Sequence, residues 1–228
     1  MSRGADWERG RQRALNLARE HVERGTPLAW FEALYAAADG KLAEVPWEDE
    51  RPQPLLVEWL EREAPSGAGQ RALVVGAGLD DDAEELARRG YRVTGFDVSP
   101  TAVDWARRRF PDSRVAYLAA DLFALPVECT SAFDLVVEVY TLQALPPELR
   151  SRAMACLAAT VAPGGRLVAV MRARDDEEAV DIDAVPWPLS PEELLALERG
   201  ELELETLEDL FDDEDPPVRR LRATFRSL

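Results

Sequence analysis

The sequence holds few residues that bind metals or move protons. Its 228 residues include one histidine, His21, one lysine, Lys41, and two cysteines, Cys129 and Cys156. The cysteines have neither CxxC nor CxxH spacing, so we expect no metal site. Two buried, unpaired thiols are typical of a reducing compartment, which indicates a cytoplasmic protein. His21 lies in a polar helical stretch, where a solvated or capping role is more common than a catalytic one.

Long apolar runs and excess positive charge are also missing. No run approaches the ~18 residues of a membrane-spanning helix, and the polar start MSRGADWERGRQRAL has no signal-peptide core. The 27 basic residues are outnumbered by 44 acidic ones, which gives a formal net charge of -17. Nucleic-acid-binding proteins usually carry a basic patch, and here the arginines at 107–109 and 219–222 are dispersed among acids. We therefore exclude nucleic acid and anionic membranes as partners.

The composition that remains is that of one folded domain. Hydrophobic residues make up 46% of the chain, which is ample for one large core. The length suits a single α/β domain with a short extension, present as a monomer or weak dimer. Arginine far exceeds lysine and alanine is abundant, as in bacterial coding sequences of high GC content.

One stretch, residues 71–97, organises the rest of the chain. It reads RALVVGAGLDDDAEELARRGYRVTGFD. A strand over 72–75 ends at Gly76 and Gly78, a short helix follows, and a second strand ends at Asp97. This is the opening unit of a nucleotide-binding α/β sheet. Asp97 falls where a carboxylate can bind ribose hydroxyls.

The charge of this stretch indicates which nucleotide binds. A dinucleotide fingerprint has a third glycine where this chain has Asp81, flanked by Asp80 and Asp82. Three carboxylates at a helix start would repel a pyrophosphate, which disfavours NAD and nucleotide sugars. They are compatible with S-adenosylmethionine (SAM), which has no phosphate and carries a sulfonium cation. We expect helix capping to be the main role of these acids, and of Asp80 in particular.

The rest of the chain alternates helices and strands. We expect helices over 5–24, 28–38, 55–63, 100–109 with Ser99 as its cap, 146–160 and 191–199, and strands over 115–119, 133–139, 166–171, 201–210 and 218–228. Thr26 is the predicted N-cap of the second helix, with Pro27 at its first position. The last two strands alternate apolar and polar residues, which predicts one buried face for each, and they form a hairpin. The pattern predicts a Rossmann-like, doubly wound, mostly parallel seven-stranded α/β sheet with an antiparallel C-terminal hairpin and an N-terminal helical lid.

These motifs together resemble the class I SAM-dependent methyltransferases. The matching segments are VVGAG with Asp97, Asp121-Leu122, FDLVVEVYTLQALPP and APGGRLV, and they cover the chain from about Arg71 to its end. The N-terminal G-T-P beside a tryptophan and the VPW connector resemble the thiopurine S-methyltransferase-like branch, which includes tellurite-resistance-type enzymes. The resemblance implies SAM as cofactor and a small-molecule methyl acceptor.

The resemblance also implies roles for individual residues. The backbone of the glycine turn would approach the methionine part of SAM. Asp97 would bind the two ribose hydroxyls, and Asp121 would accept a hydrogen bond from the adenine amino group. The implied cofactor-binding residues are Gly76, Ala77, Gly78, Asp97, Val98, Asp121, Leu122 and Glu138. Glu138 and Tyr140 would lie below the methyl-transfer centre as candidate catalytic residues. The chain departs from the family twice: Asp80 stands where a glycine is usual, and Val74 where an acid is common.

The acceptor side is predicted from aromatic residues and from the scarcity of bases. Candidate acceptor contacts are Trp30, Tyr35, Trp47, Tyr140 and Gln143, although the aromatic ones also suit core packing. A thiol is partly ionised near neutrality and needs little help from a base, so scarce histidine and lysine favour a thiol or another soft nucleophile. We expect residues 1–64 to be a lid and 65–228 the SAM-binding domain. An alternative is a degenerate SAM-binding scaffold without catalysis, because of Asp80.

Overall fold

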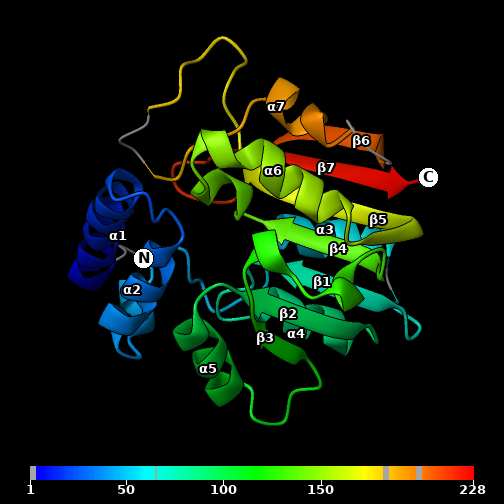
Figure 1. Cartoon of the computed structure of the whole chain (residues 1–228), viewed down its shortest axis with the longest axis horizontal. Helices are drawn as coiled ribbons and strands as arrows, with labels where there is room; N and C mark the ends of the chain where they lie inside the picture. Colours follow the sequence, from blue (N-terminus) through cyan, green and yellow to red (C-terminus); the bar gives the residue numbers. More distant parts are fainter. Residues whose placement is uncertain (1–3, 65, 182–184, 199–201) are drawn as a thin grey trace.

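A central sheet carries the fold. The computed structural model describes the chain except residues 1–3, 65, 182–184 and 199–201. Within the described residues the strand order is β3-β2-β1-β4-β5-β7-β6 (Figure 1). The strands are β1 (Arg71–Val75), β2 (Arg92–Asp97), β3 (Ala116–Ala119), β4 (Phe133–Val139), β5 (Val161–Arg172), β6 (Leu202–Phe211) and β7 (Arg219–Ser227). The first five are parallel, and β7 pairs antiparallel with both β5 and β6.

The strand order reverses beside β1. The chain runs outward from β1 through β2 to β3 and then returns to β4 on the other side of β1. In open α/β sheets, ligands bind outside the carboxyl ends of the strands at such a reversal. The predicted Rossmann-like sheet with an antiparallel C-terminal hairpin is confirmed, and its topology places the binding edge at the ends of β1 and β4.

The helices follow the predicted segments closely. They are α1 (Ala5–Glu23), α2 (Ala29–Ala38), α3 (Pro54–Glu63), α4 (Asp81–Arg88), α5 (Pro100–Arg109), α6 (Pro147–Ala158) and α7 (Pro191–Leu195), with short 3-10 turns η1 (Leu42–Glu44), η2 (Leu122–Ala124), η3 (Val127–Cys129), η4 (Leu142–Ala144) and η5 (Ala196–Glu198). The helix predicted over 191–199 is α7 followed by η5, and its last residue lies outside the described residues. Ser99 caps α5 as its side chain accepts from Ala102 N at 3.0 Å.

One predicted cap is wrong. Thr26 does not cap α2, which begins at Ala29 with Leu28 in the N-cap position and no side-chain cap. The hydroxyl of Thr26 instead lies 3.1 Å from Nδ1 of His21, within the turn that joins α1 to α2. The physical reason is that Pro27 and Leu28 form a turn before the helix, so Thr26 is too far from the helical N–H groups.

Apolar side chains fill both faces of the sheet. On one face, α6 and α7 pack on residues such as Leu73, Val136 and Leu167. On the other, α3 and α4 pack on Val74, Val137 and neighbours. The helix α3 thus belongs to the sheet's own core. Full burial of its Leu56, Trp59 and Leu60 is typical of a core helix.

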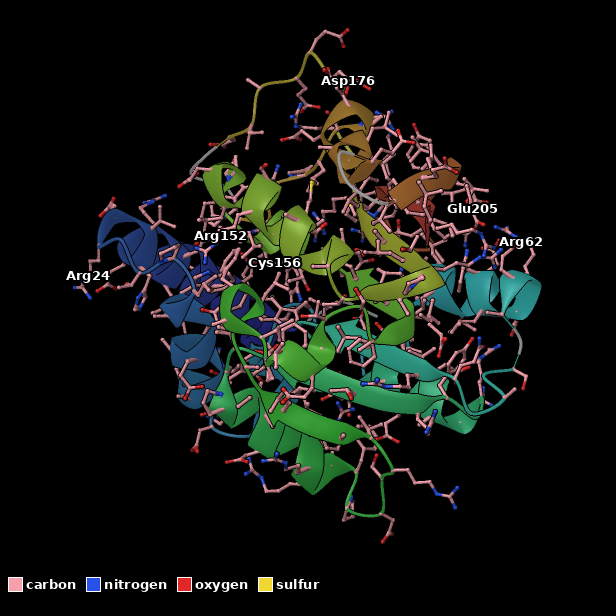
Figure 2. The ribbon with its side chains drawn as sticks, turned by 45° about the vertical axis from the view of Figure 1, so that its right-hand side comes forward. Arg24, Arg62, Arg152, Cys156, Asp176 and Glu205 are labelled. Atoms are coloured by element: carbon pink, nitrogen blue, oxygen red, sulfur yellow. The ribbon has the colours of Figure 1, made fainter. Side chains whose placement is uncertain are left out.

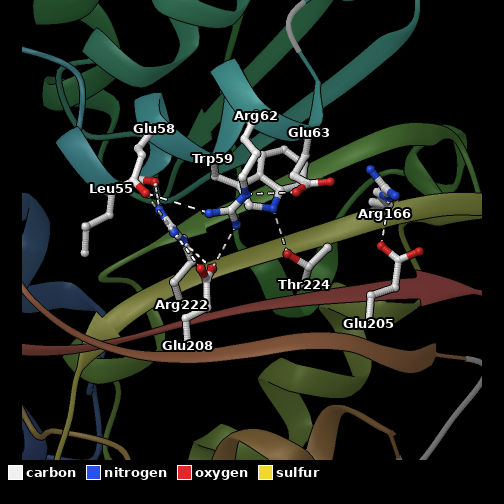
Figure 3. Close-up of polar contacts among 10 residues, drawn as sticks. All are labelled: Leu55, Glu58, Trp59, Arg62, Glu63, Arg166, Glu205, Glu208, Arg222 and Thr224. Carbon is white, nitrogen blue, oxygen red and sulfur yellow. Dashed lines mark hydrogen bonds and ion pairs between the residues drawn. The ribbon is translucent and has the colours of Figure 1, made fainter.

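Polar contacts fix α3 on β7 (Figure 3). Trp59 Nε1 donates to Thr224 Oγ1 at 2.8 Å, and Arg222 Nη1 donates to the carbonyl of Leu55 at 2.7 Å. Arg222 also pairs with Glu208 of β6 at 2.7 Å. Alternation in the sequence predicted one buried side for this strand, and β7 is in fact buried on both faces. Arg220 and Arg222 are therefore interior groups that need partners.

The helices α1 and α2 lie beside the carboxyl edge of the sheet (Figure 1). Trp30 of α2 is fully buried against Ala14 and Ala18 of α1. Glu32 of α2 accepts from Ser99 Oγ at 2.6 Å and from Thr101 Oγ1 at 2.6 Å. These contacts tie α2 to the start of α5, next to the end of β2.

Charged side chains are spread around the molecule. Arg24 near α1, Arg62 on α3 and Glu205 on β6 lie at different places on the surface (Figure 2). Cys129 is buried, but Cys156 on α6 is only half-buried, so the expectation of two buried thiols is half right. Among the residues described here, no three His, Cys, Asp or Glu side chains are grouped as metal ligands would be. No helix in the described ranges is long and apolar enough to cross a membrane.

The bond between α3 and β7 gives a stability test. Thr224→Val keeps the shape of the side chain but leaves Trp59 Nε1 buried without an acceptor. We expect a loss of about 1–3 kcal/mol in the free energy of unfolding. Thr224→Ser retains the hydroxyl and is the matched control, expected to lose less. Equal denaturation midpoints for Thr224→Val and wild type would contradict the role of this bond.

Candidate functional site

The glycine turn after β1 is built from left-handed backbone. Gly76 and Gly78 both have φ +58°, a conformation that favours glycine. A Cβ on Gly76 would collide with Oγ1 of Thr141, and one on Gly78 would lie 2.9 Å from the Tyr35 hydroxyl. Thr141 follows β4 and donates to the carbonyl of Val75 at 2.9 Å. The turn is thus enclosed by the β4 loop and by α2.

Asp97 joins the ends of β1 and β2. Its carboxyl accepts from Gly78 N at 3.0 Å through Oδ2 and from Ser99 N at 2.8 Å through Oδ1. The residue is 6% exposed, and burial raises its pKa to about 6. Each oxygen keeps a further lone pair for a ligand hydroxyl. The structure therefore holds this carboxylate in a fixed orientation at the sheet edge.

Asp80 does not cap α4, so that prediction is wrong. It occupies the N-cap position with φ +72° but makes no cap hydrogen bond. Its side chain turns inward over Gly95 of β2, and its Oδ1 is buried without a partner. Burial, followed by the charge of Asp97, raises its pKa well above the ordinary value. The left-handed backbone at Asp80 points the carboxyl toward the sheet, away from the helix N–H groups.

The other two acids of this run also have partners outside a cap. Asp81 pairs with Arg109 at 2.8 Å, at the end of α5. Asp82 Oδ1 accepts from the backbone N of Gln53 at 2.7 Å, just before α3. Capping is thus not their main role. They tie the start of α4 to neighbouring segments.

Glu138 and Tyr140 lie at the carboxyl end of β4. Glu138 is fully buried, and its Oε1 accepts from Leu142 N at 2.8 Å while Oε2 has no partner. Burial raises its pKa to about 7. Tyr140 has φ +65°, and its hydroxyl accepts from Gln53 Nε2 at 3.1 Å. Because of its left-handed backbone, Tyr140 lies on the α3 side of the sheet, whereas Glu138 lies among the β4–α6 contacts.

The predicted acceptor residues have different surroundings. Trp30 is completely buried between α1 and α2 and stacks on Phe31 at 4.0 Å between ring centroids. Tyr35 is also buried and accepts a bond of 2.9 Å from Trp47 Nε1. Trp47 is 37% exposed, so it is the one of these three aromatics with a large accessible surface. Gln143 is buried, and its Oε1 accepts from Arg172 N at 2.6 Å.

The remaining predicted cofactor residues sit at the ends of β1, β2 and β3. Ala77 N donates to Phe96 O at 2.9 Å, which closes the glycine turn onto β2. Asp121 caps η2 by accepting from Phe123 N at 2.8 Å. Val98 is half-buried and Leu122 is buried. The structure thus places the predicted cofactor residues along one edge, while their roles stay predictions.

The sequence did not point to Gln53 or Thr141, two residues that build this edge. Gln53 contacts Asp82 and Tyr140 and also caps α3 by accepting from Leu56 N at 2.8 Å. Its place directly before Pro54 was an available signal for a helix cap. Thr141 had no such signal, because its role depends on contact with a turn 66 residues away.

Comparisons with known proteins bear on this site. A family model described as "Methyltransferase domain" matches residues 72–165. That segment begins in β1 and includes the glycine turn, Asp97 and Glu138. Residues 72–165 are a methyltransferase domain.

Individual relatives and solved structures are also similar to this chain. "Probable thiol methyltransferase 2" of Arabidopsis thaliana is 30% identical over 131 residues, 55% of this chain and 56% of the relative. A 1,6-didemethyltoxoflavin-N1-methyltransferase of Burkholderia thailandensis, solved with its substrate and S-adenosylhomocysteine (SAH), gives a TM-score of 0.70 at 19% identity, covering 91% and 89% of the chains. A TehB-like SAM-dependent methyltransferase of Corynebacterium glutamicum gives 0.62 at 23% identity, covering 86% and 98%.

The family match supports the predicted methyltransferase domain over residues 72–165, and the structural matches confirm the predicted fold. The structural matches, at under 25% identity, show the fold alone, so the thiopurine and tellurite-resistance branch stays a prediction. The chain spans about half the length of the curated relative it matches. The alternative of a degenerate scaffold finds no support among these matches.

The domain's residues fit SAM in charge and shape. SAM is cationic at its sulfonium and carries ribose hydroxyls. The edge offers the oriented carboxylate of Asp97 and two buried carboxyl oxygens without a described partner, on Asp80 and Glu138. Buried carboxylates gain from a nearby cation. Gly76 and Gly78 add no side chain of their own to the turn.

Glu138 gives a pH test of these unsatisfied acids. Its folded-state pKa is about 7 against an ordinary value of 4.5, so the folded protein retains a proton that the unfolded chain has released. The free energy of unfolding therefore falls as pH rises from about 4.5 to about 7, by roughly 3 kcal/mol from this group. Glu138→Gln removes that slope. We expect its melting temperature to exceed wild type at pH 8 and the gain to shrink at pH 4.5.

Asp80 gives a second test with a matched control. Asp80→Gly relieves left-handed backbone strain and removes a buried, unpartnered carboxyl. We expect a gain of about 1–2 kcal/mol in unfolding free energy, larger at pH 8 than at pH 5. Asp39→Gly relieves similar strain at an exposed residue, φ +48°, without removing a buried charge. A gain for Asp80→Gly that equals the Asp39→Gly gain at every pH would contradict the inward carboxyl.

Proposed function

We propose that this protein transfers a methyl group from SAM to a small-molecule acceptor, a thiol or another soft nucleophile. The observation that carries the proposal is Asp97, which stands at the end of β2 with both oxygens oriented by backbone N–H groups. A carboxylate so placed binds two neighbouring ribose hydroxyls. It lies inside the segment that matches the methyltransferase domain.

The chemistry divides between cofactor and protein. SAM supplies an electrophilic methyl on a sulfonium: the acceptor's lone pair forms the new bond to carbon, the sulfonium S–CH3 bond breaks, and its electron pair stays on the sulfur of SAH. The protein's work is to orient the acceptor and exclude water. Asp97 would bind the ribose, and the Gly76–Gly78 backbone would contact the methionine part. Asp121 would bind the adenine.

The acceptor proton decides whether a base is needed. His21 is engaged with Thr26, and Lys41 lies 3.4 Å from Glu44, so both have partners in the N-terminal segment. A thiol ionises without their help. Glu138, with a pKa of about 7, is the group at the sheet edge suited to hold or release a proton near neutrality. The name of the plant relative is consistent with a sulfur acceptor.

The N-terminal segment would act as a lid through α1 and α2. Tyr35 places its hydroxyl beside the Gly78 backbone, and Trp47 bonds to that hydroxyl from the connector after η1. Trp47, Tyr35 and Tyr140 would then supply aromatic surface on the acceptor side. The helix α3 packs into the sheet core and stays fixed.

Cofactor binding is tested at Asp97. Asp97→Ala removes the acceptor for the ribose hydroxyls, and we expect SAM and SAH affinity to fall by about 1.5–3 kcal/mol, roughly 10- to 150-fold. Asp104→Ala on α5 removes an exposed acid and is the control, expected to bind as wild type does. Calorimetry with both ligands measures the change. Wild-type affinity in a folded Asp97→Ala variant would refute the proposed cofactor site.

A further inference from the structure

Two arginines face each other at the edge of the sheet beyond Tyr140. Arg172 ends β5 and Arg220 is the second residue of β7, and the two are directly paired across the antiparallel ladder. Paired residues project from the same face of a sheet with Cβ atoms about 4.5–5.5 Å apart, and like charges in such pairs are destabilising. An acidic protein has no general need for this arrangement. The pair therefore calls for a counter-charge.

The acids nearby satisfy only one of the two arginines. Arg220 is buried and pairs with Asp212 at 2.6 Å through Nε and with Glu214 at 2.6 Å through Nη2. Its Nη1 has no partner. Among the described residues, the guanidinium of Arg172 forms no ion pair or side-chain hydrogen bond, although it is half-buried. Burial and the neighbouring Arg220 lower the pKa of Arg172.

These donors lie beside the predicted methyl-transfer centre. Along the sheet order, the glycine turn follows β1, Tyr140 follows β4, Arg172 ends β5 and Arg220 is the second residue of β7, all at one edge. The Arg220 guanidinium stacks on the Tyr140 ring, 4.8 Å from the centroid. Tyr140 is in turn fixed by Gln53. A group bound by Arg172 and Nη1 of Arg220 would thus be next to the aromatic face of Tyr140.

We propose that Arg172, with the free Nη1 of Arg220, binds a carboxylate carried by the methyl acceptor. This inference rests on the proposed function, since it assigns part of the acceptor site. A guanidinium matches the planar geometry of a carboxylate and is weakly hydrated, so it binds one well in a half-buried place. The net charge of -17 repels anions at long range, so local guanidinium donors are what would retain an anionic acceptor. The acceptor class is then an aromatic or apolar nucleophile bearing a carboxylate.

The test compares two aromatic thiols of the same shape. Calorimetry on the full chain saturated with SAH would measure binding of 4-mercaptobenzoate and of the uncharged 4-mercaptobenzamide. We expect wild type to prefer the carboxylate by at least about tenfold, the effect of a charge-assisted hydrogen bond. In Arg172→Gln that ratio should fall to about threefold or less, while Arg172→Lys should retain part of it. Arg220 is left unchanged because it pairs with two acids, Asp212 and Glu214.

Arg226→Gln is the matched control. Arg226 lies on β7 at the opposite end of the strand and pairs with Glu205, so the variant should keep the wild-type ratio. Wild-type protein that does not prefer the carboxylate, or Arg172→Gln that keeps the preference, would overturn the subsite. Turnover with SAM, read as the methyl thioether by mass spectrometry, separates the two proposals. Selective binding without methylation would support the subsite and count against the proposed thiol acceptor.

Discussion

The hydrogen bond from Gly78 N to the Asp97 carboxyl connects the two strand ends on which the site depends. It fixes the glycine turn after β1 against the end of β2, and the second oxygen of Asp97 fixes Ser99. Ser99 then caps α5 and donates through its hydroxyl to Glu32 of α2. One oriented carboxylate thus links the turn, a helix start and the N-terminal helices. A buried carboxylate is stable in this place because backbone N–H groups replace part of its water.

Two acidic residues near the site lower the stability of the folded protein. Asp80 and Glu138 each bury a carboxyl oxygen without a partner, and such groups weaken the folded state. Burial raises the pKa of both, so part of that cost is avoided by holding a proton. A cationic ligand would offset the remainder. The acids that looked like a helix cap are better explained as a buried carboxyl and two tethers, one to Arg109 and one to Gln53.

The N-terminal 64 residues contribute in two different ways. Helix α3 is part of the core and is bonded to β7 through Trp59 and Arg222. Helices α1 and α2 pack on each other around Trp30 and reach the glycine turn through Tyr35. Gln53 stands between these parts and contacts both Asp82 and Tyr140. Its backbone N donates to Asp82 and its side chain donates to Tyr140, so one residue links the start of α4, the start of α3 and the loop after β4.

The sequence by itself determined the elements, the sheet class and the position of Asp97. Alternation between apolar and polar residues, glycine pairs and proline-led helix starts are local signals, so β4 was predicted over its full range and most helices to within two residues. The tertiary structure decided which way side chains turn. Asp80 faces inward because of its left-handed backbone, and Arg222 is buried because α3 covers a face of β7 that the local pattern marks as polar. Pairing of Arg172 with Arg220, or of Gly76 with Thr141, depends on segments far apart in the chain, and no local pattern encodes which of them will meet.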